Sequence, residues 1–221
     1  MKALKITAFL RCGFSASFDW SVSIDSVIAY QSQLEKLGWE RFTEHQSTGQ
    51  LKPVDDLPIA KEEFNGDWWY QVSRPFFDCK MIHTQHLHRR FNIQESEQHV
   101  NKIGKIETTK GAYKNARLAI QLFVTDRVVW YVNGDKDRIK HLLQMVTHIG
   151  GKRGSGHGAV SRWEIEDHDN LEDCRFRRIV PTEFAQQHSI DGLTLEWAIR
   201  PPYTLQENKR LCVVVENEVR T

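Results

Sequence analysis

Hydrophobic and polar residues alternate along residues 4–12, LKITAFLRC, which is typical of a strand with one buried face. From residue 23 the period lengthens to that of a helix, and SIDSVIAYQSQLEKLG predicts an amphipathic helix over 23–38. Ser23 or Asp25 can cap its start and Gly38 its end. The apolar positions that recur at helical spacing are Ile24, Val27, Ile28, Leu34 and Leu37.

The next part of the chain has a less regular pattern. Residues 39–65 show no clear period. Residues 66–92 are aromatic and β-prone on both sides of Arg74 and Pro75, which predicts a long hairpin or two extended arms. The polar, mixed-charge stretch that follows predicts a partly exposed connection.

Regular patterning returns at residue 119. Residues 119–124 and 127–132 predict a hairpin around Thr125 and Asp126. Residues 133–151 then predict a second helix, because apolar residues again recur on one face. These residues are Ile139, Leu142, Leu143 and Val146.

With a further strand predicted over 159–166, the order is strand, helix, strand, strand, helix, strand. This order predicts an α+β fold of the ferredoxin-like, RRM-like βαββαβ kind. Residues 1–38 and 118–166 would form its core, residues 39–117 a large insertion after the first helix, and residues 167–221 a C-terminal β extension.

Composition and charge narrow the classes of function. Hydrophobic residues make up 40% and charged residues 27%, and the net charge is +1, so an anionic partner must be met by a local basic patch. No stretch is long and apolar enough for a membrane span, and we expect a cytoplasmic protein that contacts no membrane. The four cysteines are scattered without a CxxC pair, which favours reduced thiols.

Such a patch occurs at residues 148–160, HIGGKRGSGHGAV, where glycines surround a Lys-Arg pair. A P-loop requires a strand before the loop and a helix after it, but here the predicted order is reversed, and GxGxxG fails on spacing. A helix C-cap explains one or two glycines. Glycine and cations together favour contact with RNA phosphates. The candidate RNA-binding residues of this loop are Gly150, Gly151, Lys152, Arg153, Gly154, Ser155, Gly156, His157 and Gly158.

A second group of candidates lies in the insertion. Arg89, Arg90 and Phe91 in HLHRRF place cations beside an aromatic ring, as single-strand binding requires. Lys110 and Lys114 in TTKGAYKNAR are further candidates.

A basic, glycine-rich loop between the second helix and last strand of a ferredoxin-like domain resembles the RAMP superfamily of CRISPR proteins. LKITAFL, SIDSVIAYQSQLEKLG, HIGGKRGSGHGAVSRWEI and AIRPPYT are similar to the small RAMP subunit of type IV effector complexes. The resemblance covers most of the chain and is weaker over 39–117. His157 departs from it, since an aromatic is expected there.

This resemblance implies a non-catalytic subunit that caps the 5′ handle of the guide RNA (crRNA). It also implies that a hairpin in the insertion acts as a thumb against the backbone RAMP subunit. The further expected partners are the large subunit of the effector and the target DNA duplex near its flanking motif. We expect no cofactor and no metal.

Other clusters of functional residue types have simpler explanations. In a strand, His86 and His88 share one face while His83 lies on the other, and no carboxylate or cysteine has zinc-ligand spacing. The acidic residues 164–173 favour a solvated face over a Mg²⁺ site. The aromatic run 68–70, WWY, favours core or subunit-interface packing over base stacking.

Two alternatives to the capping role remain open. A metal-free guide-processing endoribonuclease would need a general base and acid, and His45 or His157 are candidates. A generic RRM-like RNA-binding module outside CRISPR is the other alternative. No two histidines are tied together by the sequence, so we expect binding without cleavage.

Overall fold

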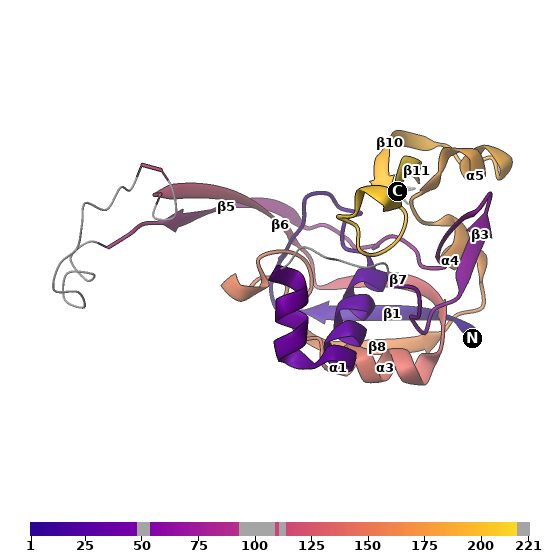
Figure 1. Ribbon diagram of the computed structural model, residues 1–221, viewed down its shortest axis with the longest axis horizontal. Helices are drawn as coiled ribbons and strands as arrows, with labels where there is room; N and C mark the ends of the chain where they lie inside the picture. The colour runs from indigo at the N-terminus through magenta and orange to yellow at the C-terminus, as the bar shows by residue number, and fades with distance from the viewer. Residues whose placement is uncertain (48–53, 93–108, 111–113, 216–221) are drawn as a thin grey trace.

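The computed structural model describes residues 1–47, 54–92, 109–110 and 114–215. Its strands and helices are, in chain order, β1 (Lys2–Leu10), β2 (Phe14–Ser15), α1 (Ile24–Ser47), β3 (Lys61–Phe64), β4 (Asp67–Tyr70), β5 (Met81–Arg89), β6 (Ala116–Val124), β7 (Arg127–Gly134), α3 (Lys136–Gln144), β8 (Val160–Asp167), α4 (Glu172–Phe176), β9 (Val180–Pro181), α5 (Thr182–Gln187), β10 (Gly192–Ala198) and β11 (Lys209–Val215) (Figure 1). The protein is therefore a sheet-rich α+β protein, in agreement with the predicted class.

The centre of the molecule is an antiparallel sheet in the order β7-β1-β8. The alternation in β1 is real: Leu4, Ile6 and Ala8 are fully buried on one face, while Lys5 and Phe9 lie on the other. The predicted strands over 4–12 and 159–166 are thus confirmed as β1 and β8.

Helices α1 and α3 cover the buried face of this sheet (Figure 1). In α3, the Asp135 carboxylate accepts hydrogen bonds from the backbone N–H groups of Asp137 and Arg138, both at 3.1 Å. This cap starts the helix later than predicted, and it ends at Gln144. In α1, Gly38 leaves the helical conformation with φ 72°, where an end was predicted, but helical backbone resumes and continues to Ser47.

The outer edge of β7 is occupied by residues 72–76, which we call the edge segment. Phe76 and Val129 exchange two backbone hydrogen bonds of 2.8 Å, and the Ser73 N–H donates to the Tyr131 carbonyl at 2.8 Å. With β1 on its other side, β7 has no free edge for another strand.

The predicted hairpin between residues 119–124 and 127–132 is therefore wrong, although both strands exist. β6 instead pairs with β5 along its whole length, from Met81 opposite Val124 to Arg89 opposite Ala116. Its base also pairs with β2. Figure 1 shows β5 and β6 extending as an arm away from the rest of the protein.

Of the two alternatives predicted for residues 66–92, the hairpin around Arg74 and Pro75 is wrong, since the edge segment runs along β7, and β4 and β5 are instead two separate extended strands. The turn lies earlier, at Asn65 and Gly66, which have φ of 50° and 84° and join β3 to β4. An Asn-Gly pair with both φ angles positive is the preferred two-residue hairpin turn. The sequence contained this signal, but the lack of a clear period over 39–65 obscured it.

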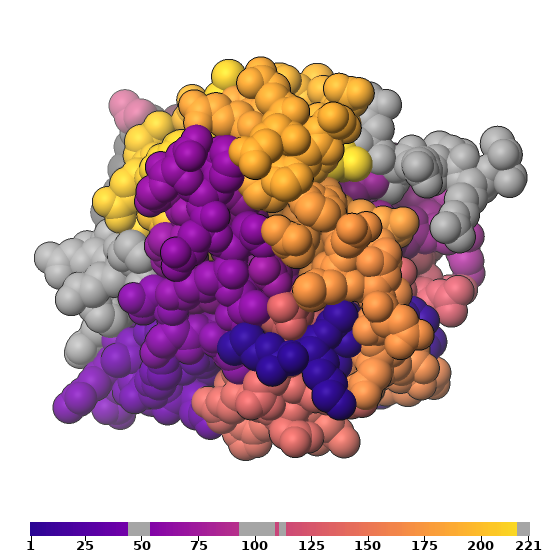
Figure 2. Space-filling model, turned by 90° about the vertical axis from the view of Figure 1, so that its right-hand side faces the viewer, coloured from indigo at the N-terminus to yellow at the C-terminus, as the bar shows by residue number. Residues whose placement is uncertain are grey.

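The C-terminal part contains a second sheet, β10-β11-β9, as predicted, and also the short helices α4 and α5, which were not predicted. Its core is a separate cluster that includes Trp69, Phe184, Ile199 and Cys212. Because Trp69 is fully buried there, the packing interpretation of residues 68–70 holds. Figure 2 shows that segments distant in sequence, coloured purple and orange, lie beside the indigo N-terminal residues at the surface.

Among the described residues, no helix is long and apolar enough to cross a membrane.

Candidate nucleic-acid interface

The glycine-rich loop between α3 and β8 is fixed at both ends and exposed in the middle. The Gly151 N–H donates to the Ser15 carbonyl at 2.6 Å, and the Gly158 N–H donates to the Gly13 carbonyl at 2.9 Å. A 3₁₀ turn over Arg153–Ser155 lies between these anchors. These hydrogen bonds fix the two ends of the loop, so its middle lies at the surface in a defined position.

The glycines of this loop serve different purposes. A Cβ atom on Gly150 would lie 2.6 Å from the Ser15 carbonyl oxygen, and one on Gly158 would lie 2.0 Å from that of Ile149. Both residues, and Gly156, also have positive φ angles of 70–84° that disfavour side chains. Gly154 is different, because a Cβ there meets nothing within 4 Å and its φ is not positive. The fold does not require Gly154 to be glycine, whereas close approach of a ligand would.

We expect Gly154→Ala to weaken RNA binding while the free energy of unfolding stays the same or rises by about 0.4–1 kcal/mol, since alanine restricts the unfolded chain. Gly158→Ala is the matched variant, and it should destabilise the protein because of the backbone overlap. Fluorescence anisotropy with RNA and urea denaturation measure the two effects. Unchanged RNA affinity in Gly154→Ala would exclude close ligand approach at this position.

Two cations of the loop face solvent. Lys152 has an αL backbone with φ 54°, and the Arg153 guanidinium lies 4.9 Å from the centre of the Tyr30 ring on α1. Both residues are exposed, and in the described part of the chain neither forms an ion pair with a carboxylate. Their charge is therefore available to an anionic ligand.

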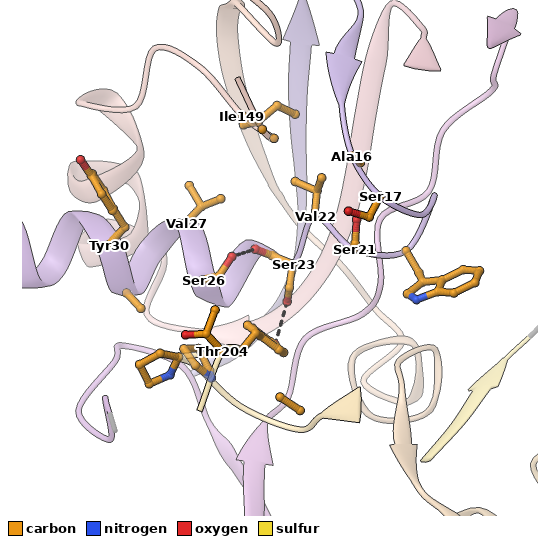
Figure 3. A pocket seen from close by; sticks show the side chains of 18 of the residues that line it. Ala16, Ser17, Ser21, Val22, Ser23, Ser26, Val27, Tyr30, Ile149 and Thr204 are labelled. Atoms are coloured by element: carbon orange, nitrogen blue, oxygen red, sulfur yellow. Dashed lines mark hydrogen bonds between the residues drawn. The ribbon is translucent and has the colours of Figure 1, made fainter. Parts of the chain in front are cut away.

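Beside these cations the protein is hollowed by a cavity of about 1120 Å³, which we call the glycine-loop cleft. It lies between the loop, α1, residues 15–23, the edge segment and residues 197–204 (Figure 3). The cations that line it are Arg74, Lys152, Arg153 and Arg178, and none of its described lining residues is an aspartate or a glutamate. Its lining residues with hydroxyl or amide groups are Ser15, Ser17, Ser21, Ser23, Ser26, Tyr30, Gln33, Ser73, Gln121, Tyr203 and Thr204.

A buried polar network forms the floor of the cleft. The Tyr203 hydroxyl donates to the Asp25 carboxylate at 2.8 Å. The Arg178 guanidinium donates to the carbonyls of Tyr70, Ile179 and Ile199. Burial raises the pKa of Asp25, and the nearby charge of Arg178 acts in the opposite direction. Burial also raises the pKa of Tyr203, which therefore remains a hydrogen-bond donor at neutral pH.

A cluster of three aromatic rings lies at the cleft, and two of them line it. Phe18 and Trp20 are stacked, with ring centres 4.7 Å apart and an interplanar angle of 1°, and Trp197 meets Phe18 edge-on at 6.1 Å. Trp20 and Trp197 line the cleft, and the buried Trp20 Nε1 has no hydrogen-bond partner among the described residues. These rings and Tyr30 were not predicted as site residues, because only folding brings them to the glycine loop.

The structure separates the two predicted groups of RNA-binding residues. The glycine loop lies on the body of the protein, while Arg89, Arg90 and Phe91 lie at the far end of the β5–β6 arm (Figure 1). Lys110 and Lys114 lie in the connection between these two strands and are exposed. In the loop itself, the Nε2 atom of His157 is buried and makes no hydrogen bond to the described residues. The side chain of His45 lies outside the described residues.

Three carboxylates in the stretch 164–173 are engaged by basic residues of the same chain. Asp167 is 2.6 Å from Lys136 and Glu166 is 3.2 Å from Lys5. Asp173 contacts His168 at 2.7 Å and Arg177 at 2.9 Å. These pairs make the stretch a salt-bridged surface.

The arm histidines are placed as their spacing predicts. His86 and His88 are two residues apart on one face of β5, opposite Ala119 and Arg117, and His83 lies on the other face. Nowhere in the described ranges do three or more metal-ligating side chains converge.

The comparisons with known proteins can now be placed beside this geometry. The family model described as CRISPR type IV associated protein Csf3 matches residues 2–215. Among curated protein sequences, none matches this chain. A chain of the cryo-EM structure of the Type III-B Cmr-beta bound to cognate target RNA is similar with a TM-score of 0.37 and 11% identity. The similarity covers 75% of this chain and 61% of that one, so it spans less than two thirds of the neighbour.

Proposed function

Because the chain belongs to the CRISPR type IV associated Csf3 family, we propose that it is the non-catalytic subunit that holds the 5′ handle of the guide RNA in the glycine-loop cleft. One observation carries this proposal: the cleft is lined by cations, hydroxyls and open glycine backbone, without a carboxylate among its described lining residues. Such a lining matches phosphates, 2′-hydroxyls and unpaired base edges, the groups through which single-stranded RNA is recognised.

The loop residues divide the binding task. Lys152 and Arg153 meet phosphates at the mouth of the cleft, where charge-assisted hydrogen bonds are strongest. The bare backbone at Gly154 lets the RNA backbone approach closely. The Tyr30 ring packs against one face of the Arg153 guanidinium, and a base can stack on the other face of that guanidinium. The serines of residues 15–26 supply hydroxyls to the sugar edge.

We further propose that the β5–β6 arm is the thumb of this subunit and docks on the backbone subunit of the effector. An isolated two-stranded hairpin is marginally stable in water. Because each strand of this arm is nine residues long, we expect a binding partner to stabilise it. One face presents Leu87 opposite Leu118, and the other presents His88 opposite Arg117. The pair Leu87 and Leu118 suits contact with a protein, and the pair His88 and Arg117 suits contact with RNA.

The central sheet supports a ferredoxin-like interpretation that differs from the predicted one. If the edge segment is the second strand, the order β1, α1, edge segment, β7, α3, β8 follows the βαββαβ plan. The β5–β6 arm is then an insertion between the second and third strands, and not part of the core.

A non-catalytic role fits the histidines of the cleft. His148 lines it and its Nδ1 lies 2.9 Å from the Thr147 hydroxyl, while the Nε2 of His157 is buried. Metal-free cleavage needs an acid and a base on opposite sides of the scissile phosphate, and a second histidine does not line the cleft in the described part of the chain.

Ultraviolet crosslinking of the assembled effector, followed by mass spectrometry and sequencing, tests this function. We expect peptides containing residues 148–158 to crosslink to the first nucleotides of the guide RNA, and the purified chain to leave labelled repeat RNA intact in EDTA and in Mg²⁺. Crosslinks confined to the 3′ end would refute the capping role. A specific RNA product lost in His148→Ala would instead establish a processing enzyme.

A further inference from the structure

We propose that the face of the central sheet turned away from α1 and α3 carries a second contact for single-stranded RNA, built on the exposed Arg127 and Arg162 and on Phe9 between them. This contact, which we call the Phe9 patch, receives nucleotides that leave the glycine-loop cleft, and to that extent it rests on the proposed function. It lies on the face of the sheet opposite to the one that α1 and α3 cover.

The strand register brings the three side chains together. Phe9 on β1 lies directly opposite Arg127 on β7 and directly opposite Arg162 on β8. Directly opposed side chains of antiparallel strands share a face, with Cβ atoms about 5 Å apart. The Arg162 guanidinium lies 3.7 Å from the centre of the Phe9 ring. The patch is thus an aromatic ring flanked by two arginines, one of them stacked on it.

The charge of the patch is not explained by packing. One arginine over Phe9 would complete a cation–π pair, but two like charges on either side of one residue repel each other. Both arginines are exposed, and neither forms an ion pair with a carboxylate of the described chain. Further along the same face, by contrast, Lys5 is paired with Glu166. An anionic ligand would remove the repulsion at the Phe9 patch.

The patch borders the glycine loop. Beyond Phe9, the exposed Arg11 donates its backbone N–H to the Ala159 carbonyl at 2.8 Å. The Cys12 thiol donates to the Gly156 carbonyl at 3.3 Å. Residues 9–12 therefore join the two surfaces, and an extended chain of four residues spans about 13–14 Å at most. A strand of RNA that crosses from the loop to the Phe9 patch would pass Arg11.

The chemistry of the patch suits unpaired nucleotides. Bases stack on aromatic rings and on the planes of arginine guanidinium groups, and Arg162 over Phe9 presents such a plane to solvent. Arg127 and Arg11 are placed beside it for phosphates. Stacking is sequence-tolerant, so the patch should guide the strand and not select its bases.

Binding of labelled oligouridylates to the full chain tests the patch. We use one of about 5 and one of about 15 nucleotides, which bracket the site sizes of single-strand modules. Arg162→Ala and Phe9→Leu should weaken binding of the long oligonucleotide about fivefold or more and leave the short one unchanged. Arg162→Lys keeps the charge but not the plane, and should give an intermediate loss. Lys140→Ala, which removes an exposed cation from α3, is the control and should bind as wild type.

The outcomes separate this inference from the proposed function. Long-oligonucleotide affinity that is unchanged in both Arg162→Ala and Phe9→Leu, with melting temperatures equal to wild type, would overturn the Phe9 patch. An equal loss for both lengths would also overturn it, because the patch would then not be a separate contact. If instead Gly154→Ala leaves the short oligonucleotide unaffected while the patch variants weaken the long one, the cleft proposal fails and the patch stands alone.

Discussion

Replacement of Lys152 and Arg153 together by glutamate is expected to abolish capture of the guide RNA while the protein stays folded. Both side chains are exposed. Lys152 has an αL backbone, and glutamate at this position would have the same conformational strain as lysine, so the substitution should not change the stability of the loop. Each lost phosphate contact lowers the salt slope of single-strand binding by about 0.7, so the slope should fall by about 1.4. Two added carboxylates at the mouth of a cleft lined by cations would also repel the strand.

Anisotropy titrations of RNA over a range of salt concentrations measure both quantities. Lys152→Arg with Arg153→Lys keeps the charge at each position and serves as the control, with affinity close to that of wild type. A charge-reversed protein with wild-type affinity and salt slope would show that the glycine loop is not the RNA site.

Arg178→Met is expected to destabilise the protein by about 3–5 kcal/mol, the usual cost of removing one partner of a buried charge network. Arg178 is 4% exposed and joins carbonyls of the C-terminal part, Ile179 and Ile199, to that of Tyr70 in the main body. Its loss would leave these oxygens unpaired and the fully buried Asp25 without its nearest compensating charge.

The destabilisation should depend on pH. Burial raises the pKa of Asp25, so its contribution to stability is fully present below the unfolded pKa of about 3.9 and is lost as pH rises through the folded value. Without Arg178 the folded pKa rises further. Arg178→Met should therefore cost more at neutral pH than near about pH 4, and adding Asp25→Asn should restore part of the loss.

Urea denaturation at the two pH values measures these differences. Lys5→Met is the control: it removes an exposed ion pair with Glu166 and should change the free energy of unfolding by no more than about 1 kcal/mol. An Arg178→Met protein within that range at neutral pH would show that the network does not hold the C-terminal part in place.

Elements that bury one face against the core were predictable from the sequence. The period of two in β1 and of 3.6 in α3 arises because each buried position must be apolar, and Leu4, Ile6, Ile139, Leu142 and Leu143 follow that rule. The glycine loop was recognisable because its composition is unusual wherever the loop lies. The sequence did not show which of these glycines the fold requires. Only the close backbone contacts at Gly150 and Gly158 identified them.

Strand pairing was not predictable to the same extent. Local patterns cannot reveal that the edge segment occupies the free side of β7 and that β6 must therefore join β5, because hydrogen bonds between strands link residues far apart in the chain. The exposed arm has few buried positions, so little hydrophobic period marks it. The Asn65-Gly66 turn was an exception, since its signal is local.

The sequence by itself determined the α+β class, the two amphipathic helices, the central strand and the basic glycine loop, since each depends on neighbours within one turn or one strand. Only the tertiary structure decided what the loop faces. Tyr30, Arg74 and Tyr203 come from three separate parts of the chain and meet at one cleft. The Phe9 patch likewise exists only through the register of β7 and β8 on β1. Such sites depend on the packing of the whole chain, and short-range patterns carry no record of it.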